Sequence, residues 1–311
     1  MNKYYSNLLK VLPEGNLERR TDLKTGNEAI YKDGVFLFGD SDDRLENPDL
    51  TERIVAEPHL VLFGCGHVGK ALYDLAVLQD MRITVLDSRE GLLTEQRLPK
   101  AERILGEYDK LLSREYESFI TPYYCIFTHG HLNDEACLLY CLRHPHSYIG
   151  MIGSKRKIEH CMSILRENCV TDDMLSKLHT PIGLPINAVT PQEIAIAIMA
   201  QIISVFRADK NAITIDASLV ANASENRGIM ARIVHKEGSS PRSVGSMMFI
   251  TESGLYGTVG GGAVELKVIE KARQMLKKNK RLLVENYSLT IKEPLSMTCG
   301  GENTILYKMV D

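Results

Sequence analysis

Residues 60–69 read Leu-Val-Leu-Phe-Gly-Cys-Gly-His-Val-Gly, an apolar run that enters a G-x-G-x-x-G turn and continues as an amphipathic helix pattern. A strand, a glycine turn and a helix in this order open a βαβ unit. The next strand pattern, residues 82–87, ends at Asp87, roughly 20 residues beyond the turn, where dinucleotide-binding folds place an acidic residue. The turn therefore predicts a Rossmann-like unit.

The alternation of strand and helix patterns continues to about residue 208. Strands are expected at 60–64, 82–87, 102–105, 123–128 and 147–152, and helices at 67–79, 132–143, 155–167 and 191–207. Strands that alternate with helices favour a parallel sheet with helices on both faces. We therefore predict an α/β protein whose residues 58–210 form a Rossmann-like, doubly wound parallel sheet.

The flanking sequence is organised differently. Residues 1–57 are polar and weakly patterned, with one plausible strand at 35–38, and we interpret them as an N-terminal appendage. Residues 211–311 are predicted to form a smaller, glycine-rich α+β domain that contains a helix over 263–278. The polar segment 208–228 is expected to link the two domains.

Charge and hydropathy exclude several classes of partner. The chain has 311 residues and a formal net charge of −3, so it lacks the basic footprint of nucleic-acid binding. The most apolar stretch, residues 194–206, is shorter than the roughly 20 residues that cross a bilayer, and the N-terminal residues lack the apolar core of a secretory signal. We expect a cytoplasmic protein with no nucleic-acid or membrane partner.

The glycine turn and the end of the second strand predict a nucleotide site. Gly64 permits the turn, Gly66 lets a pyrophosphate approach the backbone, and Gly69 lets the helix pack against the strand. Asp87 is expected to accept hydrogen bonds from a ribose, whereas Arg89 suits a 2′-phosphate or another anion. NAD, NADP and a fold that has lost its dinucleotide remain alternatives.

Two further strand ends carry polar side chains. His129 and His131 follow the strand at 123–128, and with Asp134 they are metal ligands by type, pocket-lining residues or packing residues. No fourth ligand is evident, so no metal site is predicted. Ser154 opens a helix that continues Lys-Arg-Lys, which suits either a phosphate or an exposed helix start.

Three glycine turns gather in the C-terminal domain, at 238–242, 257–265 and 298–301. Glycines let backbone N–H groups converge on a ligand because no Cβ blocks the approach. The helix after Gly262 would aim its free N–H groups at a phosphate or pterin-like anion. Any single turn can also serve a tight hairpin. Together they predict a backbone-lined anion site with the Cys299 thiol beside it.

The cysteines do not form a disulfide or zinc pattern. There are seven, and their spacings give neither a disulfide framework nor paired Cys-x-x-Cys motifs. Glycines flank Cys65 and Cys299, which leaves room for a ligand at either sulfur. We expect Cys299 to be the functional thiol and Cys65 to be a packing residue, because the side chain in a G-x-G turn commonly points away from the pyrophosphate.

These motifs resemble the XdhC/CoxI family of xanthine dehydrogenase accessory proteins. The turns Gly-Ser-Ser-Pro-Arg, Gly-Gly-Gly-x-x-Glu and Thr-Cys-Gly-Gly within 229–310 are similar to the XdhC/CoxI domain. The run Gly-x-Gly-His-Val-Gly, which contains His67, and the run Tyr-Ile-Gly-Met-Ile-Gly-Ser-Lys-Arg-Lys at 148–157 are similar to the family's Rossmann-type domain. The family usually places the glycine-rich domain first, so this chain reverses the order. It also has Ala263 where the family usually has Cys after the triple glycine.

The resemblance implies a maturation factor rather than an enzyme with its own turnover. Such a chaperone would be a cytoplasmic homodimer that binds molybdenum cofactor (molybdopterin), supports its sulfuration by a cysteine desulfurase, and hands it to a molybdenum hydroxylase apoenzyme. In this scheme Arg242 neutralises charge, Glu265 orients a donor, and Cys299 lies near the metal or carries sulfur. The backbone that binds the pterin phosphate, or the dinucleotide form of the cofactor, comes from Gly260, Gly261 and Gly262, and Gly300 and Gly301 complete the thiol turn.

Two other functions are compatible with the sequence. In an NAD(P)-dependent oxidoreductase the 64–69 turn and Asp87 would hold the cofactor, and His129 or His131 would transfer protons. An oxidoreductase function would leave the glycine-rich domain without a role. A redox-sensing module would report the state of Cys65 or Cys299.

Overall fold

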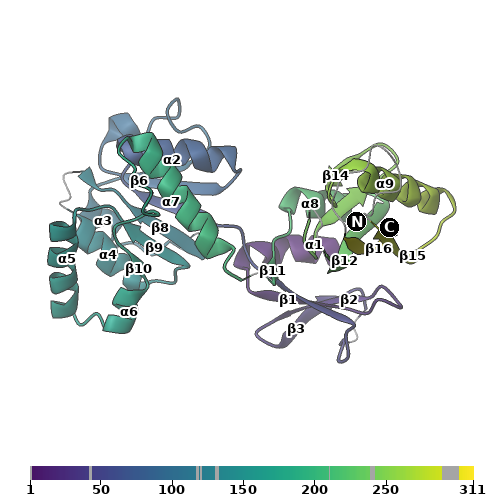
Figure 1. Ribbon diagram of the computed structural model, residues 1–311. Coiled ribbons are helices and arrows are strands. Elements are labelled where there is room, and N and C mark those ends of the chain that lie inside the picture. The colour runs from purple at the N-terminus through teal and green to yellow at the C-terminus, as the bar shows by residue number, and fades with distance from the viewer. Residues whose placement is uncertain are drawn as a thin grey trace. The chain divides into compact units, whose positions relative to one another are not determined.

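The computed structural model describes the chain except for residue 1 and residues 42–43, 117–118, 120, 130–132, 210, 239–241 and 289–300. The chain divides into two compact units (Figure 1). Residues 57–210 form the first, which we call the Rossmann unit. Residues 1–56 and 211–311 together form the second, which we call the composite unit. The divisions lie after residues 56 and 210, and the N-terminal segment folds together with the C-terminal one.

The Rossmann unit contains a six-stranded parallel sheet in the order β10-β9-β8-β5-β6-β7. Its strands are β5 (His59–Phe63), β6 (Arg82–Asp87), β7 (Glu102–Leu105), β8 (Pro122–Ile126), β9 (Tyr148–Met151) and β10 (Leu178–His179). The predicted α/β class and parallel sheet are confirmed. Five strands lie close to their predicted positions, and the two-residue β10 was not predicted.

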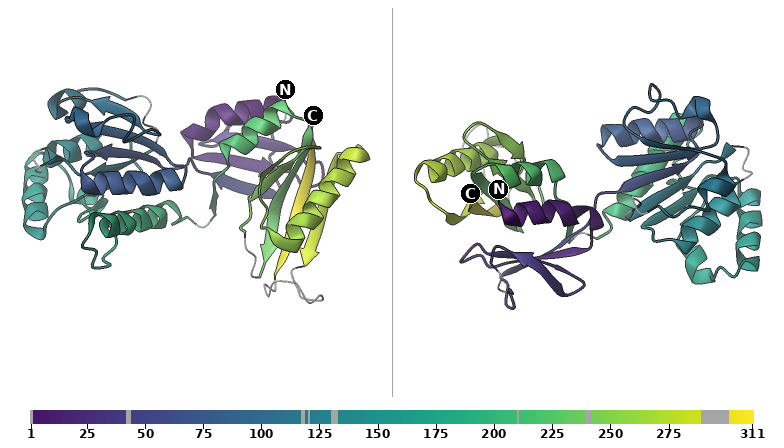
Figure 2. Two further views of the ribbon diagram at one scale, coloured as in Figure 1. Left: turned by 90° about the horizontal axis from the view of Figure 1, so that it is seen from above. Right: turned by 180° about the vertical axis from the view of Figure 1, so that it is seen from behind.

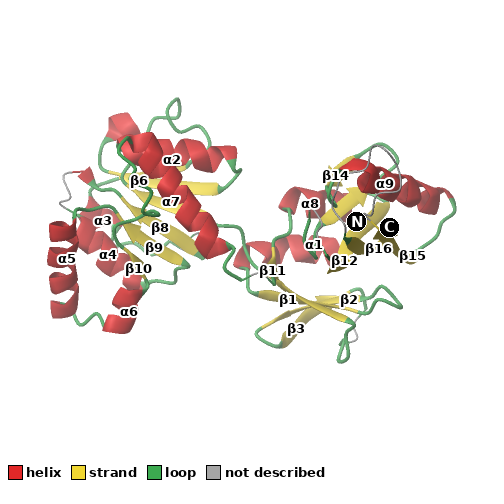
Figure 3. Ribbon diagram, in the orientation of Figure 1, coloured by secondary structure: helices red, strands yellow, loops and turns green. Residues whose placement is uncertain are grey.

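Helices cover both faces of this sheet (Figure 3). One face is covered by α2 (His67–Leu78) and α7 (Pro191–Phe206), and the other by α3 (Tyr108–Leu111), α4 (Asp134–Arg143), α5 (Lys155–Glu167) and α6 (Asp172–Ser176). A short 3-10 helix, η2 (Glu90–Leu92), follows β6. The central strand β5 is buried on both sides, as its unbroken apolar run requires.

Gln201 shows why a polar residue interrupts the apolar pattern of α7. Its side-chain oxygen accepts hydrogen bonds from the Tyr148 hydroxyl at 2.6 Å and from the N–H of Gly183 at 2.8 Å. The side chain therefore ties α7 to β9 and to the loop after β10. Among the described residues, no helix combines the length and the hydropathy that a membrane span requires.

The composite unit contains two five-stranded sheets, ordered β11-β4-β1-β2-β3 and β14-β13-β12-β16-β15. The first is formed by β1 (Leu17–Thr21), β2 (Glu28–Lys32), β3 (Val35–Gly39), β4 (Leu50–Ile54) and β11 (Ala212–Ile213), antiparallel except where β11 pairs with β4. The second is antiparallel and comprises β12 (Gly228–Glu237), β13 (Met247–Ile250), β14 (Leu255–Gly257), β15 (Leu282–Ser288) and β16 (Glu302–Val310).

Helix α9 (Gly262–Lys277) packs on one face of the β12 sheet. The opposite face packs against α1 (Lys3–Val11), α8 (Ala217–Glu225) and the first sheet, and η1 (Leu12–Glu14) follows α1. The two chain ends lie close together in this unit (Figure 2), where the Asn2 side chain donates to the carbonyl oxygen of Asp311 at 3.4 Å. The 208–228 segment is therefore more than the expected linker, because it supplies β11 and α8.

A buried ion network joins the two sheets of the composite unit. Glu52 on β4 accepts hydrogen bonds through Oε2 from Nε of Arg19 at 2.9 Å and from Nη1 of Arg232 on β12. The side chains of Arg19, Arg232 and Glu52 are 0%, 1% and 3% exposed. Nη2 of Arg232 also lies 2.9 Å from Glu28 Oε1 and donates to the Thr21 hydroxyl at 2.8 Å. Because buried charges require partners, this network ties residues 1–56 to the C-terminal domain.

Glu28 is the second carboxylate of this network. Burial opposes its ionisation, but Lys308, Arg232 and Arg19 outweigh the burial and lower its pKa to about 2. Lys308 on β16 contacts both Glu28, at 3.3 Å, and Asp40. The β2–β3 region of the first sheet is therefore linked by charge to β16 of the second.

Candidate functional site

The order of the Rossmann strands places a crevice at the ends of β5 and β8. From β5 the chain proceeds through β6 to β7 on one side, and β8, β9 and β10 add on the other. The direction of winding therefore changes between β5 and β8. In open α/β sheets, ligands bind outside the carboxyl ends of the strands at such a switch point. The glycine turn follows β5 here, and Thr128 and His129 follow β8.

The three glycines of the turn differ in what surrounds them. Gly64 has φ +103°, and a Cβ on it would lie 2.3 Å from the carbonyl oxygen of Phe127. A Cβ on Gly69 would lie 2.5 Å from the carbonyl oxygen of Gly64, so only glycine lets α2 start this close to β5. Gly66 differs, because no described atom lies within 4 Å of where its Cβ would be. Gly66 is thus the open position of the turn.

Gly66 is also the N-cap of α2, and it supplies no side-chain cap. The first N–H groups of a helix have no intrahelical acceptor and carry the positive end of its dipole. An uncapped helix start beside an open glycine suits a phosphate. His67 is the first residue of α2, and its side chain lines a cavity of about 360 Å³ together with Lys70, Arg97 and Ile196.

Asp87 lies at the end of β6, as predicted, but its carboxylate is committed within the protein. Oδ2 accepts the N–H of Cys65 at 2.8 Å and Nη2 of Arg89 at 2.7 Å. Oδ1 accepts the backbone N–H of Arg89 at 3.0 Å and its Nε at 2.9 Å. Burial opposes ionisation, but these hydrogen bonds lower the pKa of Asp87 below its ordinary value. The carboxylate anchors the glycine turn and pairs with Arg89.

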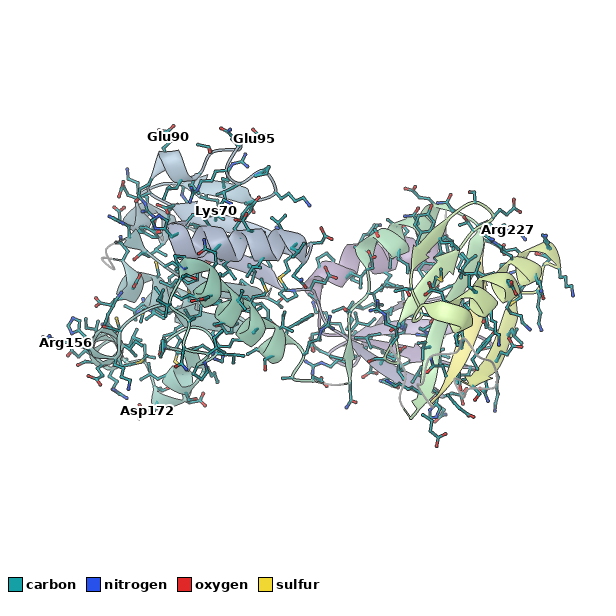
Figure 4. All side chains as sticks on the ribbon, turned by 45° about the horizontal axis from the view of Figure 1, so that its top comes forward. Lys70, Glu90, Glu95, Arg156, Asp172 and Arg227 are labelled. Atoms are coloured by element: carbon teal, nitrogen blue, oxygen red, sulfur yellow. The ribbon has the colours of Figure 1, made fainter. Side chains whose placement is uncertain are left out.

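Cys65 is the packing residue that its position in the G-x-G turn predicts. Its side chain is 0% exposed in the core beneath α2 and α7, and burial raises the pKa of its thiol. Its backbone is bound at both ends, because its N–H donates to Asp87 and its carbonyl oxygen accepts Nη2 of Arg97 at 3.2 Å. The turn is therefore held by the end of β6 and by the β6–β7 connection, in which Glu90 and Glu95 point to solvent (Figure 4).

Asp134, at the start of α4, links the turn after β8 to α5. Its side chain is fully buried, accepts the N–H of Thr128 at 3.2 Å and the Thr128 hydroxyl, and pairs with Lys157 of α5. Asp134 therefore positions the β8–α4 turn. Ser154 is the N-cap of α5 and makes no side-chain cap, and Arg156 in the first turn of α5 is exposed (Figure 4).

His129 directly follows Thr128, whereas His131 lies outside the described residues. Within the described part of the chain, no three His, Cys, Asp or Glu side chains are grouped to hold a metal ion.

In the composite unit, the triple-glycine loop is arranged around Glu265. Gly260, Gly261 and Gly262 have φ values of +138°, +78° and +66°, and Gly261 is the N-cap of α9. Oε2 of Glu265 accepts the N–H of Val259 at 3.2 Å and of Gly261 at 3.0 Å, and the hydroxyl of Thr258. Partial burial raises the pKa of Glu265, but these hydrogen bonds outweigh it and lower the pKa.

Glu265 therefore fixes the loop through the N–H groups of Val259 and Gly261, and the N–H of Gly260 donates to the Thr258 hydroxyl at 3.1 Å. An anion at this helix start would rely on other amides. Gly261 remains open, because no described atom lies within 4 Å of where its Cβ would be. Arg242 is exposed at the surface, and Gly301 directly precedes β16. Cys299 and Gly300 lie outside the described residues.

The structure adds residues that sequence reasoning missed. Arg97 holds the glycine turn from a segment with no recognisable pattern. Lys157 pairs with Asp134 and lies in the Ser-Lys-Arg-Lys run that follows β9. Its place in that run could have marked it as a candidate partner for a carboxylate at the end of the neighbouring strand. Thr258 precedes the triple-glycine loop and donates to Glu265.

Comparison with known proteins gives matches in both units. Residues 60–202 match the family described as the XdhC Rossmann domain, and residues 221–288 match the XdhC and CoxI family. The chain is 32% identical over 153 residues to the uncharacterized protein YqeB of Escherichia coli, covering 48% of this chain and 27% of that protein. It is 28% identical over 152 residues to a Bacillus subtilis protein described as a probable subunit of xanthine dehydrogenase, covering 49% of this chain and 44% of that protein. The matches thus span less than half of either relative.

A crystal structure of a xanthine dehydrogenase from Bacillus halodurans is similar in fold, with a TM-score of 0.52 and 24% identity over 67% of this chain and 64% of that one. At this identity the likeness shows the fold alone. The family matches are stronger evidence of relationship, because they fall on the two glycine-bearing regions and in the predicted order. The chain therefore combines the two domains of the XdhC and CoxI family, with the Rossmann domain preceding the XdhC/CoxI domain.

Proposed function

We propose that this chain is an accessory factor that binds molybdenum cofactor and delivers it, in sulfurated form, to a molybdenum hydroxylase of the xanthine dehydrogenase type. The family matches and the description of the Bacillus subtilis relative support an association with xanthine dehydrogenase. In this proposal the partners are the hydroxylase apoenzyme and a cysteine desulfurase, and the factor is a homodimer without turnover of its own.

The observation that carries this proposal is the open glycine at the start of α9. A ligand can approach the backbone at Gly261, where a side chain would otherwise stand. Glu265 holds the loop in its three left-handed conformations, and the remaining N–H groups at the helix start suit a phosphate. The residues present therefore fit the terminal phosphate of a pterin cofactor. The bound cofactor would supply the metal and its sulfur ligand.

The other roles in this proposal follow the sequence. Arg242 is exposed and available to neutralise charge on the cofactor. Cys299, in the Thr-Cys-Gly-Gly sequence, is proposed as the thiol near the metal. A thiolate is the soft ligand class that suits molybdenum–sulfur chemistry.

Replacing Gly261 with Val should lower activation of the hydroxylase by at least about tenfold, the scale of losing one charge-assisted hydrogen bond. The branched side chain would fill the open space. The assay combines this chain, molybdenum cofactor, a cysteine desulfurase and the hydroxylase apoenzyme, and measures hydroxylase turnover.

Gly34→Val is the matched control. Gly34 lies in the β2–β3 turn of the same unit, has φ +77° against +78° for Gly261, and is equally open. Both variants place Val at a positive φ with open space around its Cβ, so the comparison is made between the folded proteins. The site is misplaced if a folded Gly261→Val protein activates as well as Gly34→Val does.

A further inference from the structure

The carboxylate of Asp87 has no vacant acceptor for a ribose. A carboxylate offers about four lone-pair positions, and four protein donors fill them. They are the backbone N–H groups of Cys65 and Arg89 and the Nε and Nη2 groups of Arg89, at 2.7–3.0 Å. The side chain of Asp87 is 1% exposed. A ribose diol, which must donate its hydroxyls to this residue in NAD-type recognition, would have to displace a bidentate ion pair.

Arg89, unlike Asp87, retains hydrogen-bonding groups that are open to a ligand. Its side chain is 33% exposed, and Nε and Nη2 point to Asp87. Among the described residues, no acceptor pairs with its Nη1. A guanidinium that is fixed on one edge and open on the other is preorganised to receive a phosphate.

A second arginine from the same connection flanks the turn. Nη2 of Arg97 donates to the carbonyl oxygen of Cys65, while its Nε is buried and has no hydrogen-bond partner. Arg97 lines the cavity of about 360 Å³ that His67 and Lys70 also line. Lys70 is already paired with Asp74 at 2.6 Å. The positive groups that remain available around the turn, among the described residues, are therefore the two arginines and the start of α2.

We propose that the Rossmann unit selects a nucleotide whose ribose carries a phosphate monoester, as in NADP, over one with a free ribose diol, as in NAD. Arg89 receives the monoester, the start of α2 at Gly66 receives the pyrophosphate, and Asp87 serves to orient Arg89. This inference concerns the Rossmann unit and does not rest on the proposed cofactor-delivery function.

The test is titration calorimetry on the full chain at one fixed ionic strength, with 2′,5′-ADP against ADP and with NADP against NAD. We expect 2′,5′-ADP to bind at least about tenfold more tightly than ADP, the effect of a charge-assisted bond to a phosphate, and NADP to be preferred over NAD. Arg89→Gln should remove this preference and leave ADP binding nearly unchanged. Arg82→Gln is the control, because Arg82 is exposed at the other end of β6 and its loss changes the net charge equally.

If Arg89→Gln fails to fold, Asp87→Asn distinguishes a ribose-binding role of Asp87 from a phosphate-binding role of Arg89. It keeps the positive charge of Arg89 but weakens its orientation, so a reduced preference for 2′,5′-ADP should remain. A ribose-reading Asp87 would instead lose affinity for NAD. Equal or tighter binding of ADP and NAD by the parent protein overturns the proposal. So does a preference that persists in Arg89→Gln, or the absence of binding by all four nucleotides. Pterin binding by the composite unit is measured separately, so failure of one proposal leaves the other intact.

Discussion

Replacing Glu52 with Gln should lower the free energy of unfolding of the composite unit by about 3–5 kcal/mol, the usual effect of removing one partner from a buried ion pair. The substitution keeps the size of the side chain but removes the charge that Arg19 and Arg232 both face. Since neither guanidinium can reach water, two buried cations would be left with one carboxylate fewer. Urea unfolding, followed by hydrogen–deuterium exchange of peptides from β1 and β12, measures the loss in this unit alone.

Glu18→Gln is the matched control for this prediction. Glu18 lies on the neighbouring strand and pairs with Arg20 at 2.5 Å, but its side chain is 39% exposed. Exposed pairs contribute about 0–1 kcal/mol, so the control should change little. Similar losses in both variants would show that the buried network does not hold the N-terminal segment in place.

Replacing Gly69 with Ala should destabilise the Rossmann unit by at least about 2 kcal/mol, because the added methyl group meets backbone rather than a movable side chain. Gly66→Ala, three residues earlier, should leave stability nearly unchanged, since Gly66 has an ordinary φ of −66° and open space around it. Thermal unfolding of the two variants measures this difference.

Gly66→Ala should, in contrast, weaken nucleotide binding although it leaves stability nearly unchanged. We expect Gly66→Ala to lower affinity for 2′,5′-ADP by about tenfold, because the methyl group occupies the approach to the N–H groups at the start of α2. Unchanged nucleotide affinity in Gly66→Ala would place the ligand elsewhere, and a fully stable Gly69→Ala protein would show that the α2–β5 approach is looser than the structure indicates.

The Rossmann unit was predictable because its signals are local. The apolar run before Gly64, the open and closed glycines of the turn, and Asp87 at the end of β6 each follow from a few neighbouring residues. What local pattern could not give was the state of Asp87. Its carboxylate pairs with Arg89, two residues away, and anchors the glycine turn through the N–H of Cys65.

The composite unit was harder to predict because its stabilising contacts join distant parts of the chain. Arg19, Glu52 and Arg232 are residue types that usually face solvent, so no sequence pattern marks them as a buried cluster. Arg232 is 180 positions from Glu52. Only the folded chain shows that residues 1–56 complete the C-terminal domain rather than stand as an appendage.

Glu265 illustrates a partly predictable site. The family resemblance implied that Glu265 orients a donor, and in the structure its carboxylate accepts hydrogen bonds from Val259, Gly261 and Thr258. The sequence did not show that the carboxylate itself uses amides of the triple-glycine loop, because that depends on the positive φ values of the three glycines.

The pterin content of the full chain, purified anaerobically from cells that make molybdenum cofactor, tests the central claim most directly. Denaturation followed by oxidation converts bound molybdopterin into a fluorescent pterin that can be counted per chain. The account predicts stoichiometric pterin in the parent protein and in Gly34→Val, and its loss in folded Gly261→Val. Parent protein that carries no pterin and takes up none from added cofactor, or a Gly261→Val protein that retains as much as Gly34→Val, would contradict it.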